Sequence, residues 1–147
     1  MVSPRARCHR CGVAVRALLV DDNPEFLARA AAFLASQPGL TIVGYAAAGA
    51  EAVEKAETLK PDLLLMDLAM PDLGGIEVTA RVKRLADPPK VVLVSLHDTP
   101  EYREAARRAG ADSFVSKDHF AEAILLVVGS HFPEASAVSL PAPENQG

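Results

Sequence analysis

At Leu63–Asp67 the chain reads LLLMD, four apolar side chains followed by a carboxylate. A short apolar run bounded by turn residues is typical of a strand that is buried on both faces. Similar runs, each ending in a charged or hydroxyl side chain, occur at Leu18–Asp22, Val91–Ser95 and Ser113–Lys117. In a parallel sheet these ends share one edge, which would collect three carboxylates, one hydroxyl and one ammonium. The pattern predicts a site for a cation and a phosphate at that edge.

Around these runs, strands and helices alternate five times. The predicted strands are Val15–Val20, Thr41–Ala46, Asp62–Asp67, Val91–Ser95 and Asp112–Ser116, and the predicted helices are residues 24–37, Gly49–Leu59, Ile76–Leu85, Pro100–Ala109 and Asp118–Val128. Asn23 is a candidate N-cap before Pro24, and Gly110 is a candidate C-cap. Short links in such an alternation require parallel strands, right-handed crossovers and helices on both faces of the sheet. We therefore predict a doubly wound α/β fold, with ligands bound outside the C-terminal ends of the strands.

Length and composition predict one domain and exclude several classes of function. The chain has 147 residues, of which 50% are hydrophobic, and its formal net charge is −4. This charge lacks the basic footprint of nucleic-acid binding. No apolar stretch approaches the roughly 18 residues of a membrane span, and no signal peptide precedes the first strand. We expect a cytoplasmic protein with one folded domain over residues 15–128, between a disordered leader (1–14) and a disordered tail (129–147).

The leader contains the two cysteines of the chain, Cys8 and Cys11, with His9 between them. A Cys-x-x-Cys pair occurs in half of a zinc site or in a redox pair. A structural zinc site needs four ligands, and no second half follows here. We favour a leader without a metal, and the role of the pair stays open.

The charged strand ends carry the predicted chemistry. Asp21, Asp22 and Asp67 at neighbouring strand ends would repel one another, which raises the pKa of at least one of them. A hard divalent cation such as Mg²⁺ relieves this repulsion, with waters and a phosphate completing its shell. Lys117 would supply a fixed positive charge for a phosphoryl oxygen, and Ser95 a neutral hydrogen-bond donor. The residues therefore favour a phosphoryl group on, or beside, one of the aspartates.

With these motifs in order, residues 15 to about 128 resemble a response-regulator receiver domain of two-component signalling. The resemblance rests on Asp21-Asp22, Asp67-Leu68-Ala69-Met70-Pro71 with Gly75, Ser95, and Phe114-Val115-Ser116-Lys117-Asp118. The segment from Ser95 to Tyr102 resembles the subfamily that usually precedes a helix-turn-helix output domain. The resemblance implies a flavodoxin-like (βα)5 fold, a five-stranded parallel sheet in the order 2-1-3-4-5.

The resemblance also implies roles for the acidic residues. Asp67 would be the phosphoacceptor for a phosphohistidine on a sensor histidine kinase or phosphotransfer protein. Asp22 would be the main ligand of Mg²⁺, or of Mn²⁺, together with Asp67. Asp21 would bind the metal through water, and Ala69 through its backbone carbonyl. Such a protein is a phosphoacceptor with slow autodephosphorylation and not a turnover enzyme.

Three further residues would complete the transfer and the switch. Lys117 and the metal would neutralise the phosphoryl oxygens. Ser95 would move towards the phosphoryl group, and Phe114 would rotate into the space that Ser95 leaves. This coupled change would repack the surface of the fourth helix, the fifth strand and the fifth helix, where a downstream protein target would bind.

We interpret the chain as a stand-alone receiver of a phosphorelay, with two alternatives. One is a receiver-like dimerisation or interaction module that is never phosphorylated. The other is a phosphohydrolase of the haloacid-dehalogenase type, which requires a second aspartate where this chain has Ala69. A helical wheel places Leu125 and Leu126 opposite the stripe of the fifth helix that faces the sheet. They predict a homodimer through this helix, unless Phe132 of the tail covers them.

Overall fold

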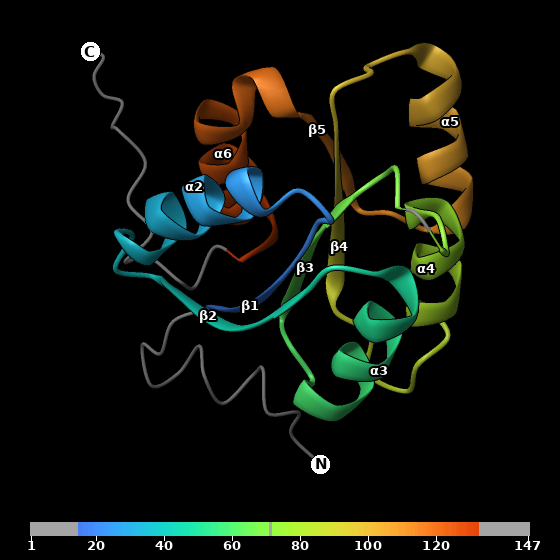
Figure 1. Ribbon diagram of the computed structural model, residues 1–147, viewed down its shortest axis with the longest axis horizontal. Helices are drawn as coiled ribbons and strands as arrows, with labels where there is room; N and C mark the ends of the chain where they lie inside the picture. Colours follow the sequence, from blue (N-terminus) through green and yellow to red (C-terminus); the bar gives the residue numbers. More distant parts are fainter. Residues whose placement is uncertain (1–14, 71, 133–147) are drawn as a thin grey trace.

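The computed structural model describes residues 15–70 and 72–132 and shows one sheet of five parallel strands (Figure 1). The strands are β1 Val15–Val20, β2 Leu40–Ala46, β3 Leu63–Asp67, β4 Lys90–Ser95 and β5 Ser113–Ser116. The helices are α2 Pro24–Ala35, α3 Gly49–Leu59, α4 Gly75–Val82, α5 Pro100–Ala109 and α6 Phe120–His131, with a 3₁₀ turn η1 at Lys117–His119. The strand order β2-β1-β3-β4-β5 confirms the predicted flavodoxin-like topology. The predictions for the leader, including Cys8 and Cys11, and for residues 133–147 lie outside the described residues.

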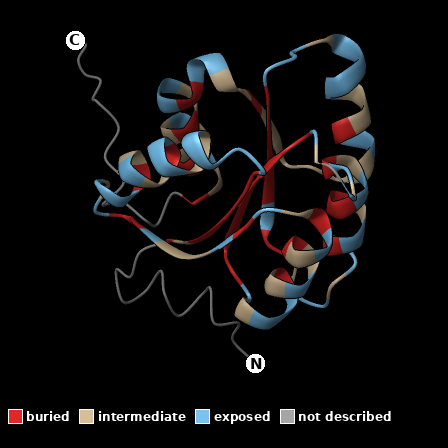
Figure 2. Ribbon diagram, in the orientation of Figure 1, coloured by how far each residue is buried: buried red, intermediate tan, exposed pale blue. Residues whose placement is uncertain are grey.

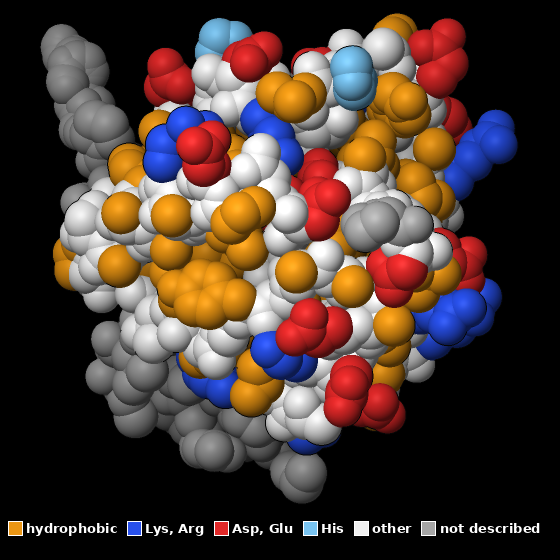
Figure 3. All heavy atoms as spheres, viewed as in Figure 1, with side chains coloured by type: hydrophobic (Ala, Val, Ile, Leu, Met, Phe, Trp, Pro, Cys, Tyr) orange, Lys and Arg blue, Asp and Glu red, His pale blue; other side chains and the backbone are white. Residues whose placement is uncertain are grey.

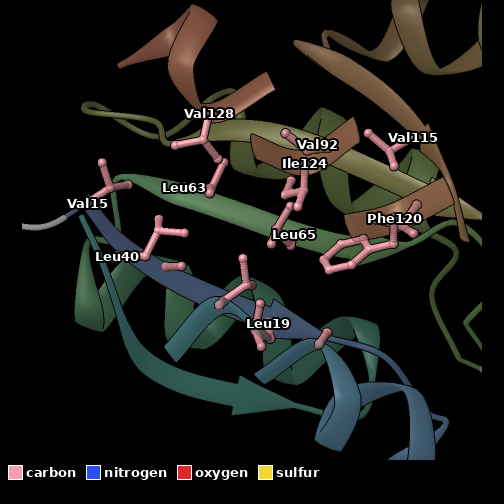
Figure 4. Close-up of a cluster of buried hydrophobic side chains, with 14 of the residues drawn as sticks. Val15, Leu19, Leu40, Leu63, Leu65, Val92, Val115, Phe120, Ile124 and Val128 are labelled. Carbon is pink, nitrogen blue, oxygen red and sulfur yellow. The ribbon is translucent and has the colours of Figure 1, made fainter. Parts of the chain in front are cut away.

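Helices cover both faces of the sheet. In Figure 1, α2 and α6 lie on one face, and α3, α4 and α5 lie on the other. The side chains of β3 point alternately to the two faces of the sheet. Leu63 and Leu65 belong to the first core cluster, on one face, and Leu64 and Met66 belong to the second core cluster, on the other. Buried residues are concentrated in the strands (Figure 2), and Figure 4 shows side chains of the first cluster between the sheet and α6. The apolar run that ends in Asp67 is therefore the central strand of the sheet.

Local capping explains where several helices begin and end. The Asn23 side chain accepts hydrogen bonds from the backbone N–H groups of Glu25 and Phe26, which confirms the predicted N-cap of α2. Gly110 ends α5 with φ +103°, as its predicted C-cap role requires. Lys60 ends α3 with φ 49°, a left-handed conformation that its sequence does not predict.

Some element boundaries differ from the prediction. The helix α2 ends at Ala35, and α4 begins at Gly75 and ends at Val82. A 3₁₀ turn precedes α6, which starts at Phe120 and continues to His131. Residues 129–131, which the sequence pattern places in the tail, therefore extend this helix. Among the helices of residues 15–70 and 72–132, none is long and apolar enough to cross a membrane.

The predicted apolar outer face of α6 is wrong for Leu125. Leu125 is partly buried and packs against the core cluster that includes Ile124 and Val128. The reason is that Val128 lies only about 60° from Leu125 around the helix, and the extended helix carries the core on to buried Phe132. Leu126 is 62% exposed and is the residue of the pair that faces outward.

Candidate functional site

Three aspartates meet where β1 and β3 end. The two strands pair in parallel, with Val20 opposite Met66, so that Asp21 and Asp67 follow at the same edge. Asp21, Asp22 and Asp67 each offer a carboxylate oxygen, and these oxygens lie within 4.8 Å of one another. Asp21 and Asp67 are buried, whereas Asp22 is exposed. Acidic side chains are visible near the middle of the face shown in Figure 3. The structure thus brings together the carboxylates that the sequence places at strand ends.

Asp67 carries the most perturbed charge of this group. The pKa of its carboxyl group is raised from 3.8 to about 6, mainly by burial and then by repulsion from Asp21. The Lys117 ammonium and a hydrogen bond from the backbone N–H of Ala69 oppose this rise in pKa. At neutral pH Asp67 is therefore ionised. Its negative charge is poorly compensated, so a cation placed beside it would be stabilising.

The Lys117 ammonium lies between the two buried carboxylates. Lys117 follows β5 directly, and its Nζ is 2.7 Å from Asp21 Oδ2 and 3.5 Å from Asp67 Oδ1. Its side chain is only 9% exposed. The sequence places Lys117 opposite Asp67, and the structure adds that the ammonium lies closer to Asp21.

The donor set fits a hard divalent cation. Asp21 Oδ1 accepts a hydrogen bond from the backbone N–H of Asn23. Asp21 Oδ2 is buried, and the Lys117 ammonium approaches it at 2.7 Å. Two buried carboxylates that share one ammonium, plus the exposed carboxylate of Asp22, leave excess negative charge and match the oxygen ligands and partial hydration that Mg²⁺ prefers.

Ser95 ends β4 at the same edge, with its hydroxyl turned towards its own loop. Its Oγ donates to the backbone carbonyl of His97 at 3.1 Å and accepts from the backbone N–H of His97 at 3.0 Å. The residue is buried. A move of this hydroxyl towards Asp67 would cost both hydrogen bonds and would release the start of the β4–α5 loop.

Phe114 lies on β5 beneath an arginine whose contact with it the sequence does not predict. Phe114 is partly buried, and the Arg103 guanidinium carbon is 5.0 Å from its ring centroid. Two hydrogen bonds of 2.5 and 2.9 Å hold Arg103 on the carboxylate of Asp98. These bonds lower the pKa of Asp98. The β4–α5 loop thus holds Ser95 directly through His97, and it holds Arg103 of α5 over Phe114 through Asp98.

Sequence reasoning also misses Phe26. The centroid of its ring lies 4.5 Å from Lys117 Nζ, and the ring makes an edge contact with Phe120 at 5.3 Å. An aromatic residue in the first turn of an amphipathic helix is ordinary core material, so no local signal identifies it. Its position becomes evident only once α2 and η1 lie side by side.

Comparison with known proteins gives consistent results. Residues 17–128 match the response regulator receiver domain family. The response regulator protein VraR of Staphylococcus aureus is 38% identical over 105 residues, which cover 70% of this chain and 49% of VraR. The signal receiver domain of NarL from Mycobacterium tuberculosis superposes with a TM-score of 0.78 at 32% identity, covering 82% of this chain and 98% of that domain.

A second similar structure contains a metal. The CheX–CheY–BeF3–Mg²⁺ complex from Borrelia burgdorferi matches with a TM-score of 0.78 at 25% identity, over 84% of this chain and 93% of the matched chain. This chain spans about half the length of the curated relatives it matches.

Proposed function

The chain belongs to the response regulator receiver family, and from this premise we propose that Asp67 accepts a phosphoryl group from a histidine kinase or phosphotransfer protein. The observation that supports this most directly is the buried Asp67 carboxylate with Asp21, Asp22 and Lys117 around it. An Asp67 oxygen would attack the phosphorus of a phosphohistidine, and the bond from phosphorus to the imidazole nitrogen would break. The products are an aspartyl phosphate and a free histidine on the donor.

The acidic residues would hold a divalent cation, Mg²⁺ or Mn²⁺. Asp22 and Asp67 would bind it directly, Asp21 through water, and Ala69 through its backbone carbonyl. The ion supplies neutralisation of the phosphoryl oxygens when bound. The three carboxylates with only the Lys117 ammonium close to the two buried ones support a cation at this place. The similar CheY complex from Borrelia burgdorferi, which holds Mg²⁺ and BeF3, supports the same assignment.

Lys117 and Ser95 would contact the phosphoryl oxygens. Lys117 is already within 3.5 Å of Asp67 Oδ1, whereas Ser95 must give up its two hydrogen bonds to His97. That exchange would loosen the loop that also holds Arg103 over Phe114, and Phe114 would then rotate inward. The surface of α5, β5 and α6 would change as a result, and a downstream protein would recognise this change.

Intact-protein mass spectrometry tests the phosphoacceptor. We expect one phosphoryl-sized mass increment after incubation with Mg²⁺ and acetyl phosphate, and its loss with a chelator or in Asp67→Asn. Asp62→Asn is a matched control, because Asp62 is also a buried aspartate but lies at the opposite end of β3. An increment that survives Asp67→Asn would refute Asp67 as the acceptor. No increment, together with no beryllofluoride binding, would favour the interaction module that is never phosphorylated.

Two finer features stay predictions. One is action as a stand-alone receiver. The other is a homodimer through α6, whose proposed contact now centres on Leu126 because Leu125 packs against the core. Leu126→Glu should shift a dimer to a monomer in size-exclusion chromatography without changing the fold. An unchanged elution volume would refute this contact.

A further inference from the structure

The Lys117 ammonium is enclosed on more than its acidic side. Asp21 and Asp67 approach Nζ at 2.7 and 3.5 Å, and the ring centroid of Phe26 lies 4.5 Å from the same atom. The side chain of Lys117 is 9% exposed, so little water reaches the ammonium. A cation near the face of an aromatic ring is attracted by the ring quadrupole, and more strongly when it is desolvated.

The position of the Phe26 ring is fixed from two directions. Its backbone N–H donates to the Asn23 side chain, which sets the first turn of α2. Its ring packs edge-on against Phe120, with centroids 5.3 Å apart and an interplanar angle of 77°. Phe120 begins α6 directly after the turn that carries Lys117. The Phe26 ring therefore packs on the first residue of the helix that directly follows the turn carrying Lys117.

We propose that Phe26 is a positioning residue for phosphoryl transfer, because its ring holds the Lys117 ammonium beside Asp67 in place of water. The inference rests on the proposed function of Asp67. An ammonium has three N–H donors, and an aromatic face attracts its charge without being a strong hydrogen-bond acceptor. The ring thus keeps the ammonium in place while leaving a donor available for an incoming phosphoryl oxygen. Without the ring, water would compete for that donor and Lys117 would be less restrained.

Phe33 provides a matched control on the same helix. It lies seven residues after Phe26, and its ring also contacts Phe120 edge-on, with centroids 6.5 Å apart. The cation–ring contact with Lys117 belongs to Phe26. A role in core packing alone predicts similar behaviour of the two rings. A role through the ammonium predicts that position 26, but not position 33, responds when the negative charge on the ring face is reduced and the ring shape is kept.

The test is a series of fluorinated phenylalanines in the full chain. Phenylalanine with one, two or three ring fluorines is placed at position 26, and separately at position 33. The rate of Asp67 phosphorylation by acetyl phosphate is measured at saturating Mg²⁺, together with the Mg²⁺ dissociation constant and the melting temperature. Fluorine withdraws electron density from the ring face and changes the ring volume little.

We expect the logarithm of the rate to fall with each fluorine at position 26, by about five- to thirtyfold over the series. The Mg²⁺ dissociation constant should change less than about twofold, since Lys117 is not a metal ligand. The series at position 33 should be flat, and Phe26→Trp should retain more activity than Phe26→Leu. A flat series at position 26, or an equal fall in both series, would overturn the role of Phe26 while leaving the phosphoacceptor intact. Failure of the wild-type chain both to become phosphorylated and to bind beryllofluoride would overturn both.

Discussion

Replacing Asp67 with asparagine should stabilise the metal-free protein, and increasingly so as the pH rises. The raised pKa of Asp67 means that the folded state binds its proton more tightly than the unfolded state does. Ionisation of this carboxyl group therefore opposes folding. The cost is absent well below the unfolded pKa of 3.8, grows between 3.8 and about 6, and is complete above that range. Asparagine has nearly the same shape and carries no charge, so Asp67→Asn does not incur this cost.

The magnitude follows from the size of the shift. A pKa of about 6 against 3.8 corresponds to at most about 3 kcal/mol at neutral pH. From about pH 4.5 to about pH 7.5, the stability advantage of the variant should grow by about 2 kcal/mol, because part of the cost is already present at the lower pH. Asp67 is 7% exposed, so solvent screens this effect only slightly. A bound cation would lower the pKa of Asp67 and reduce the gap.

Urea unfolding across this pH range, in the presence of a chelator, measures the gap in free energy of unfolding between the wild type and Asp67→Asn. Asp72→Asn is the control for a change from aspartate to asparagine. Backbone hydrogen bonds from Gly49 and Ala50 lower the pKa of Asp72, so its stabilising contribution is lost only below this pH window. The gap between wild type and Asp72→Asn should therefore be nearly constant across the window. A constant gap for Asp67→Asn as well, or one that shrinks with rising pH, would refute an uncompensated Asp67 charge.

Three further substitutions test other parts of the structure. Lys60→Gly should raise the free energy of unfolding by about 1 kcal/mol, because the left-handed φ of 49° is strained for lysine. Urea unfolding measures this gain, and a lower urea midpoint than that of the wild type would contradict it. Gly75→Ala should destabilise by about 1–3 kcal/mol in the same assay, since a Cβ there would lie 2.7 Å from the carbonyl oxygen of Asp67, whereas Gly74→Ala meets no atom closer than 4.0 Å and should cost less. Mg²⁺ at about 100 times its dissociation constant should stabilise the wild type by about 2.7 kcal/mol in a thermal melt, and an equal gain in Asp22→Asn would exclude Asp22 as a ligand.

The sequence predicts those parts of the fold that depend on local pattern. The apolar run of β3 is buried on both faces, so its length and position follow directly from composition, and the predicted and observed strands both end at Asp67. Because parallel strands end at a common edge, the sequence predicts that the three aspartates lie close together, and this prediction needs no helix orientation. The predicted caps at Asn23 and Gly110 are likewise local hydrogen-bonding and backbone effects.

The remaining features depend on how elements far apart in the sequence pack together. Arg103 lies over Phe114 because α5 is rotated so that this face meets β5, and no periodicity in either segment specifies that rotation. The extension of α6 depends on a pocket for Phe132 in the first core cluster. Each is a tertiary contact that overrides a weak local preference.

The distribution of partners explains why we propose Asp67, rather than one of the other two carboxylates, as the phosphoacceptor. Asp22 is exposed, so water solvates its charge. Asp21 is buried but receives the closer approach of Lys117, at 2.7 Å, and a hydrogen bond from Asn23. Asp67 is buried with the ammonium at 3.5 Å and with the charge of Asp21 nearby. Its charge is the least compensated of the three, so a cation or a bond to phosphorus relieves more unfavourable energy there than at either neighbour.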